Sequence, residues 1–177
     1  EGALPLHPGR ARRLAVVGPN GDSSEALMGC YSFVNHVLAH HPGVPAGIGI
    51  PTVVDAIRAE FPDTAVTFIP GTDVEGDDAA GIAGAVAAAR EADLVVVVVG
   101  DRAGLFGRGT VGEGNDVDDL ELPGIQRRLV EEVVAAGAPV ALVVLSGRPY
   151  AIGWALDGET APAAVVQAFF PGEEGAD

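Results

Sequence analysis

Five short runs of apolar, mostly β-branched residues limit the folds that are open to this chain. They occupy residues 13–19, 65–71, 94–101, 140–147 and 163–170. None of them alternates strictly between apolar and polar residues, as a strand with one face in water would. Unbroken runs of this kind are typical of strands buried on both faces, so they predict a sheet that is covered on each side.

Amphipathic segments lie between these runs, at residues 51–61, 81–91 and 123–136. The second repeats apolar residues at i, i+3, i+4 and i+7 from Ile82, which is the spacing of a helix face turned toward a core. The repeated order of strand, helix and strand predicts an α/β fold. We expect a three-layer α/β/α sandwich around a mainly parallel sheet of about five or six strands.

Composition narrows the range of partners and compartments. With 177 residues, 48% of them hydrophobic, the chain is long enough for one domain with a sizeable core. Its net charge is −15 and all 10 basic residues are Arg, so nucleic acid and anionic membrane surfaces are not expected partners. Cys30 is the only cysteine, which excludes an internal disulfide and a thiolate metal cluster. A single thiol fits a reducing, cytoplasmic compartment, although secretion stays open, and no cofactor is expected.

Ligands of parallel sheets bind beyond the carboxyl ends of the strands, which here means the loops that begin at Gly18, Gly100 and Gly147. The first of these loops is rich in glycine, but it does not match G-x-G-x-x-G. The P-loop pattern is excluded because it needs a lysine and the chain has no Lys. A turn at residues 19–21 is a better interpretation than a phosphate cradle.

His36 and His40 would share one face of a helix, but Val37 stands where a zincin has glutamate, so surface or packing roles are favoured and no metal is expected. After the fourth apolar run we expect a glycine turn and a helix started by Pro149. Arg148 there is interpreted as a partner in a structural ion pair, in preference to a contact with a sugar hydroxyl. Tyr150 and Trp154 are interpreted as packing residues.

Residues 107–124 form a loop with five acidic residues directly after one of the most apolar runs. Asp118, Asp119 and Glu121 precede the third amphipathic segment, where the positive end of a helix dipole would favour negative charge, so a capping role is predicted for them. Asp116 has no assigned role. Glu113 differs from the others because Gly112 and Gly114 flank it, freeing the backbone and letting a second surface approach. From spacing alone, a catalytic carboxylate and a mobile solvated loop both remain open.

Six separated stretches, taken together and in this order, resemble the C-terminal α/β sandwich domain of glycoside hydrolase family 3, among its bacterial β-glucosidases and β-xylosidases. They are RLAVVGPNGD, PGTDV, AVAAAREADLVVVVVGD, GEGNDVDDLELPGIQRRLVEEV, GAPVALVVLSGRPYAIGWA and VVQAFFPGEEG. The resemblance covers residues 13–177. It implies that residues 1–12 are a connector from a preceding (β/α)8 barrel, and that the domain is truncated at its C-terminal end.

The resemblance also implies a retaining, exo-acting β-glycosidase that hydrolyses terminal β-linked sugars at an active site between two domains. The family's nucleophile, an aspartate, belongs to the barrel, and its general acid/base falls on Glu113. Phe106 and Arg108 are then expected near the entrance, against the leaving-group sugar. Asn115 and Val117 depart from the residues that relatives often carry beside the acid/base.

Three hypotheses follow for the function. The first is the acid/base-bearing domain of a β-glycosidase, inactive as an isolated fragment, with either glucose or xylose as the sugar. The second is a stand-alone, flavodoxin-like module that binds a small ligand in the strand-end crevice without catalysis. The third is a structural domain that only steadies a partner.

Overall fold

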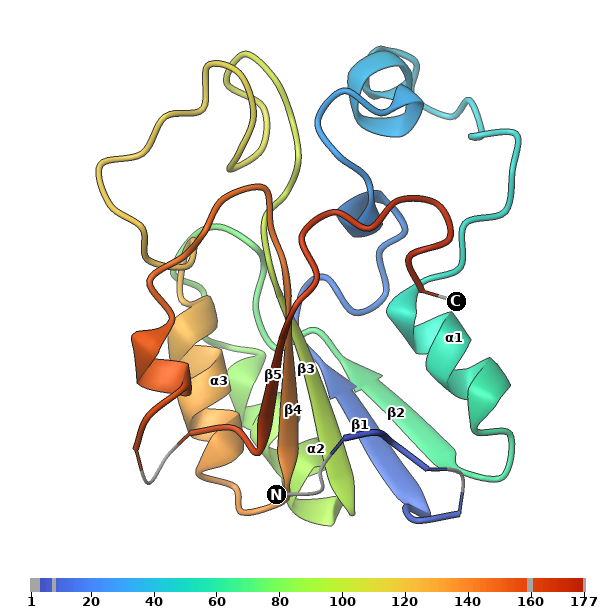
Figure 1. The fold of residues 1–177 in the computed structure, drawn as a ribbon, viewed down its shortest axis with the longest axis vertical. Helices are drawn as coiled ribbons and strands as arrows, with labels where there is room; N and C mark the ends of the chain where they lie inside the picture. The colour runs from blue at the N-terminus through green and yellow to red at the C-terminus, as the bar shows by residue number, and fades with distance from the viewer. Residues whose placement is uncertain (1–3, 8, 159–160, 177) are drawn as a thin grey trace.

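The computed structural model describes residues 4–7, 9–158 and 161–176. These residues form a five-stranded parallel sheet in the order β2-β1-β3-β4-β5 (Figure 1). The strands are β1 (Arg13–Val17), β2 (Ala65–Ile69), β3 (Leu94–Gly100), β4 (Val140–Leu145) and β5 (Ala164–Gln167). Each lies inside a predicted apolar run, and the predicted α/β sandwich with a parallel sheet is confirmed.

Within the described residues, three α-helices join the strands: α1 (Val53–Glu60), α2 (Ile82–Glu91) and α3 (Gln126–Val134). The first begins at a capping box, in which the Thr52 hydroxyl accepts a bond from the Asp55 amide at 3.1 Å and the Asp55 carboxylate accepts one from the Thr52 amide at 3.2 Å. The first two helices lie within two residues of their predicted bounds. Shorter helical turns occupy Glu25–Leu27, Phe33–Val37, Leu38–His40 and Gly153–Ala155.

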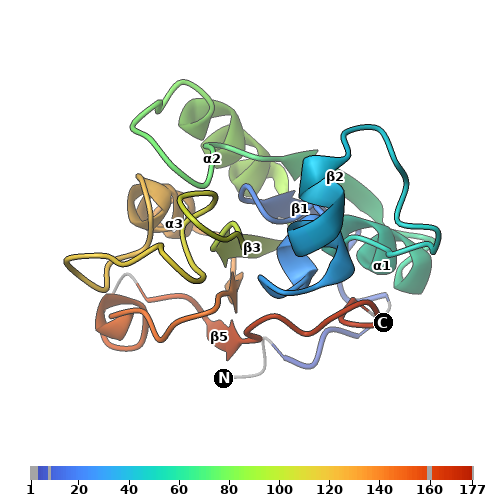
Figure 2. The same ribbon diagram turned by 90° about the horizontal axis from the view of Figure 1, so that it is seen from above.

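The sheet is covered on both faces, because successive side chains along β1, β3 and β4 enter different cores. Ala15 and Val17 of β1 pack on the side of α2 and α3, whereas Leu14 and Val16 pack on the side of α1. Figure 2 shows α2 and α3 on one side of the sheet and α1 on the other. This two-sided burial explains the unbroken apolar character of the strands.

The segment after β4 differs from its prediction. In place of a helix started at Pro149, the described residues of this segment have no regular structure up to the short helical turn Gly153–Ala155. The Ala151 amide donates a hydrogen bond to the Leu120 carbonyl at 2.7 Å. This amide therefore binds the neighbouring loop, and is not free to begin a helix.

The loops after β1, β3 and β4 gather at the carboxyl edge of the sheet, as predicted. They rise together at the top of Figure 1. Chain order reverses between β1 and β3, so this edge contains the topological switch point at which α/β sheets bind ligands. Gly100 allows the close contact there, since a Cβ at this residue would lie 1.8 Å from the Leu145 carbonyl oxygen.

Candidate active site

Glu113 lies on the long loop between β3 and α3, which folds back on itself soon after leaving the sheet. The Gly104 amide donates to the Val111 carbonyl at 3.0 Å, and the Phe106 amide donates to the Glu113 carbonyl at 2.7 Å. The Glu113 side chain is exposed. The loop is therefore ordered by its own backbone while its carboxylate stays accessible.

The glycines beside Glu113 both have positive φ angles, 125° at Gly112 and 77° at Gly114. A Cβ at Gly112 would lie 1.8 Å from the Gly104 carbonyl oxygen. The predicted freedom of the backbone at these two positions is confirmed, because a residue with a side chain is strained at either φ. At Gly112 it would also collide with the opposite strand of the loop.

The Asn115 side chain holds two parts of the same loop together by hydrogen bonds. Its Oδ1 accepts a bond from the Gly107 amide at 3.1 Å, and its Nδ2 donates to the Arg108 carbonyl at 2.8 Å. A residue that the sequence marked only as a departure from relatives thus closes the turn between residues 107 and 115.

Tyr31, from the segment after β1, reaches across to the candidate acid/base. Its hydroxyl donates a hydrogen bond to Glu113 Oε2. This bond is the main cause of a raised pKa of Tyr31, because ionising the phenol would destroy the bond to the carboxylate. The neighbouring Cys30 thiol donates to the Val111 carbonyl at 3.4 Å, so two consecutive side chains support the loop.

Asp101, the first residue after β3, is fully buried and joins its own loop to the segment after β4. Its Oδ2 accepts from the Gly147 amide at 2.9 Å, and its Oδ1 accepts from the Thr110 hydroxyl at 2.6 Å and from the Tyr150 hydroxyl. Burial, followed by the bond to Asp101, raises the pKa of Tyr150. Sequence reasoning assigned Asp101 no role. The available signal was an acidic residue directly after a strand buried on both faces.

Arg148 does not form the predicted ion pair with any described residue. Its Nη2 donates instead to two main-chain carbonyls, those of Thr110 at 3.1 Å and Asn115 at 2.8 Å. The carboxylate of Asp101 already accepts bonds from three other donors. The expectation that Tyr150 packs in the core is confirmed, since it is 8% exposed.

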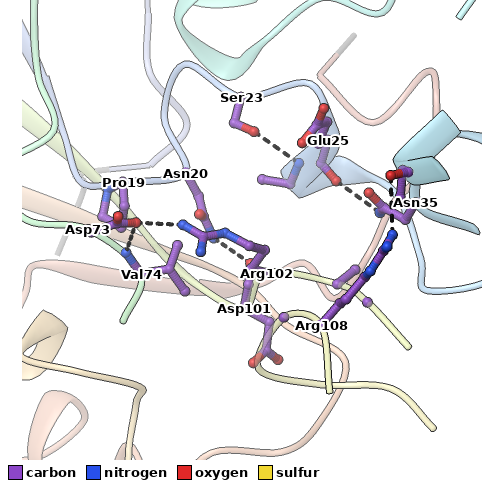
Figure 3. Close-up of a pocket in the computed structure, with 15 residues that line it drawn as sticks. Pro19, Asn20, Ser23, Glu25, Asn35, Asp73, Val74, Asp101, Arg102 and Arg108 are labelled. Atoms are coloured by element: carbon purple, nitrogen blue, oxygen red, sulfur yellow. Dashed lines mark hydrogen bonds and ion pairs between the residues drawn. The ribbon is translucent and has the colours of Figure 1, made fainter. Parts of the chain in front are cut away.

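A polar pocket of about 240 Å³ lies at the switch point between β1 and β3 (Figure 3). Arg102 projects into it and pairs with Asp73 at 2.6 Å and with Glu75 at 3.3 Å. Arg108 also lines the pocket and donates to the Ala39 carbonyl at 3.1 Å. Phe106 instead sits at the turn of the loop, 71% exposed, with a positive φ of 56°. The two predicted leaving-group contacts therefore come from one loop but point into different surroundings.

The remaining acids of the loop do not cap α3. The helix begins at Gln126, and no described side chain caps its first turn. Asp119 accepts a bond from the Glu121 amide at 2.9 Å, and Glu121 pairs with Arg127 at 3.4 Å. The capping prediction was wrong because residues 121–125 form a turn that separates the acids from the helix.

The described residues contain no group of three or more His, Cys, Asp and Glu side chains that could hold a metal ion.

The His36 ring lies 5.7 Å from the ring of Tyr31, so it packs beside the residue that contacts Glu113. In the part of the chain that the structure describes, we find no helix long and apolar enough to cross a membrane.

Comparison with known proteins decides the family. The model of the glycosyl hydrolase family 3 C-terminal domain matches residues 1–177. The chain belongs to this family. A β-D-xylosidase 3 of Arabidopsis thaliana is 34% identical over 175 residues, which are 98% of this chain and 20% of the relative. A β-xylosidase of Formosa agariphila is 32% identical over 152 residues, which are 85% of this chain and 20% of that protein.

Solved structures agree with the fold of the family 3 domain. A β-glucosidase involved in saponin metabolism from intestinal bacteria superposes with a TM-score of 0.84 at 27% identity, covering 99% of this chain and 28% of that one. The chain spans about a fifth of the length of the curated relatives described above. The predicted family resemblance is thereby confirmed.

Proposed function

We propose that this chain is the acid/base-bearing domain of a retaining, exo-acting β-glycosidase, a β-glucosidase or a β-xylosidase, and that Glu113 is the general acid/base. The observation that carries the proposal is the exposed Glu113 carboxylate, held by a neighbouring hydroxyl on a loop whose two glycines permit its backbone shape. The relatives with β-xylosidase and β-glucosidase names support the same class of reaction.

In the first step, Glu113 gives its proton to the glycosidic oxygen while an aspartate of the barrel domain attacks the anomeric carbon. The bond to the leaving group breaks and a glycosyl-enzyme forms. In the second step, the Glu113 carboxylate takes a proton from water, whose oxygen attacks the anomeric carbon and releases the aspartate. Retaining chemistry needs the two carboxyl groups about 5–5.5 Å apart, so the exposed loop must face the barrel across a cleft.

Residues 1–12 are the connector from the barrel in this proposal, and residues 13–177 are the sandwich domain. Phe106 and Arg108 take the leaving-group side, because they lie on the loop that carries Glu113. The N-terminal barrel of the same polypeptide supplies the nucleophile and most of the sugar pocket. The isolated chain is therefore expected to be inactive, since it cannot form the glycosyl-enzyme.

The acid/base role is tested by Glu113→Ala in the full-length protein. We expect kcat/KM for an alkyl β-glycoside to fall about 10²- to 10⁴-fold, the usual range for general acid catalysis. A 2,4-dinitrophenyl glycoside needs no protonation of its leaving group, so its kcat/KM should change little, and azide should partly restore its turnover. Asp116→Ala, at an exposed acid of the same loop, is the matched control. Equal, small losses with both substrates would assign the role elsewhere.

The inactivity of the isolated chain is tested by assaying it with aryl β-glucosides and β-xylosides. Turnover that persists through further purification, and that disappears in Glu113→Ala, would contradict the need for a second domain.

The alternative of a small-ligand binding module rests on the polar pocket at the switch point. Its polar side chains are largely engaged already, since Arg102 pairs with Asp73 and Asn20 donates to the Asp101 carbonyl at 3.1 Å. Few groups are left to bind a ligand. We therefore favour the glycosidase.

A further inference from the structure

The segment after β4, residues 146–150, is firmly attached to the sheet. The Ser146 hydroxyl donates to the Arg148 carbonyl at 2.9 Å and accepts from Gln167 Nε2 of β5, also at 2.9 Å. The Gly147 amide donates to the buried carboxylate of Asp101. Arg148 thus extends from a part of the molecule that is fixed to three neighbouring strands.

Its guanidinium donates hydrogen bonds to the loop of Glu113 on both sides of that residue. One nitrogen, Nη2, donates to the carbonyl of Thr110, three residues before Glu113, and to the carbonyl of Asn115, two residues after it. Hydrogen bonds from a charged donor are stronger than those between neutral groups. The two bonds close residues 110–115 into a bracket with Glu113 inside it.

The rest of the side chain shows that these two carbonyls determine its orientation. Arg148 Nε is buried and finds no hydrogen-bond partner among the described residues. Buried donors are usually paired, so an orphaned Nε indicates that the guanidinium is turned to suit Nη2. The side chain thus binds the two loop carbonyls through Nη2 and leaves its Nε donor unpaired among the described residues.

The loop needs such a support because glycines are frequent in it. Gly107, Gly109, Gly112 and Gly114 all have positive φ angles, and each widens the conformational freedom of an unsupported chain. A general acid must stay within hydrogen-bond reach of the oxygen that it protonates, and a displacement of about 1 Å can cost about 10²-fold in rate.

We infer that Arg148 is a positioning residue, whose Nη2 bonds to the carbonyls of Thr110 and Asn115 hold Glu113 in place to protonate the leaving group. The inference rests on the proposed acid/base function of Glu113. Arg148 touches no reacting atom; it acts through the backbone on both sides of the acid.

The decisive variant is Arg148→Lys in the full-length protein. It keeps the positive charge, but its nitrogen ends near the position of the guanidinium carbon, about 1.3 Å short of Nη2. Neither carbonyl is then within a good hydrogen-bond distance. Arg148→Met, which also removes the charge, is the second variant. Arg128→Lys and Arg128→Met are the matched controls, since this exposed arginine pairs only with Glu132 among the described residues.

Two measurements are made on each variant. Hydrogen exchange of peptides covering residues 103–116 is expected to be about tenfold faster in Arg148→Lys and unchanged in the controls. kcat/KM for an alkyl β-glycoside is expected to fall about 10- to 100-fold, with less than threefold change for the dinitrophenyl glycoside. If Arg148 had a purely structural role, kcat/KM would fall equally for both substrates.

The inference would be overturned if Arg148→Lys showed wild-type hydrogen exchange. It would also be overturned if kcat/KM fell equally for the two substrates in this variant. Glu113→Ala is assayed in parallel to separate the two failures. If Glu113→Ala shows the leaving-group dependence and Arg148→Lys does not, the positioning role alone is wrong. If Glu113→Ala lacks that dependence, the acid/base assignment fails and the positioning role fails with it.

Discussion

The Tyr31 hydroxyl donates a hydrogen bond to Glu113 Oε2, although 82 positions separate the two residues in the chain. Tyr31 belongs to the segment after β1 and Glu113 to the loop after β3. The contact joins the two loops that flank the topological switch point. It gives the exposed carboxylate one fixed neighbour, whereas Arg148 acts only on its backbone.

Tyr31→Phe is predicted to impair acid catalysis selectively in the full-length protein. The ring and its contact with His36 are kept, and only the partner of the carboxylate is lost. kcat/KM for an alkyl β-glycoside should fall about three- to tenfold, a small part of the roughly 10²- to 10⁴-fold that a general acid supplies. The dinitrophenyl glycoside serves as the control substrate. A similar fall for both substrates would mean that Tyr31 contributes to binding and not to the placement of Glu113.

Gly112→Ala is predicted to distort the acid/base loop more than Gly107→Ala. Both glycines have positive φ angles, 125° and 85°, which cost an alanine about 1–2 kcal/mol. Only at Gly112 does the new methyl meet the backbone, 1.8 Å from the Gly104 oxygen, whereas nothing lies within 4 Å at Gly107. We expect a clearly larger fall in Tm for Gly112→Ala, at about 2–4 °C per kcal/mol for a domain of this size. Equal Tm values for the two variants would show that the loop rearranges around the new methyl at Gly112 without losing stability.

Gln126 at the start of α3 ties the helix to the end of β3. It is fully buried; its Oε1 accepts from the Gly100 amide at 2.8 Å, and its Nε2 donates to the carbonyls of Gly100 at 2.8 Å and Val74 at 3.0 Å. Gln126→Leu keeps the volume but leaves these groups unpaired, at about 1–3 kcal/mol each. We predict a loss of about 3–5 kcal/mol in the free energy of unfolding, measured with denaturant.

Gln167→Leu is the matched control for this prediction. Gln167 is half-buried, and its one short bond goes to the Ser146 hydroxyl at 2.9 Å. A loss of about 1 kcal/mol is expected. Comparable losses in the two variants would contradict a special role for Gln126.

The strands and the first two helices could be predicted because their signals are local. A β-branched run such as residues 94–101 is apolar on both faces wherever it is placed, and its burial followed. The start of α3 was misplaced for a reason outside the segment. Gly124, with a φ of 61°, packs so closely on the neighbouring chain that a Cβ there would lie 2.8 Å from the Gly76 oxygen, so residues before Gln126 turn.

The site was only partly predictable. The glycines beside Glu113 signalled an unusual backbone, and their positive φ angles confirm it. The partners of the loop were missed because they come from distant segments. Arg148 was expected to find a carboxylate, but Asp101 accepts from Thr110, Tyr150 and the Gly147 amide, so its oxygens are taken. Competition of this kind between donors is decided by tertiary packing.

Asp93, at the amino edge of β3, provides a test of stability against pH. Its Oδ2 accepts from the amides of Arg13 and Arg12, both at 2.9 Å, and these bonds lower the pKa of the carboxyl group. A carboxyl group whose pKa is lower in the folded state stabilises the fold above its unfolded pKa of about 3.9. That contribution is lost as the pH falls through the lower, folded pKa.

Asp93→Asn should therefore have a lower Tm than the wild type at pH 7, with a difference that shrinks as the pH falls below about 4. The neutral amide cannot provide the charge that strengthens both main-chain bonds. Thermal unfolding of both proteins between pH 7 and pH 3 measures this difference, with the exposed Asp63→Asn as the control. A difference that stays constant over the whole range would show that Asp93 acts through its shape and not through its charge.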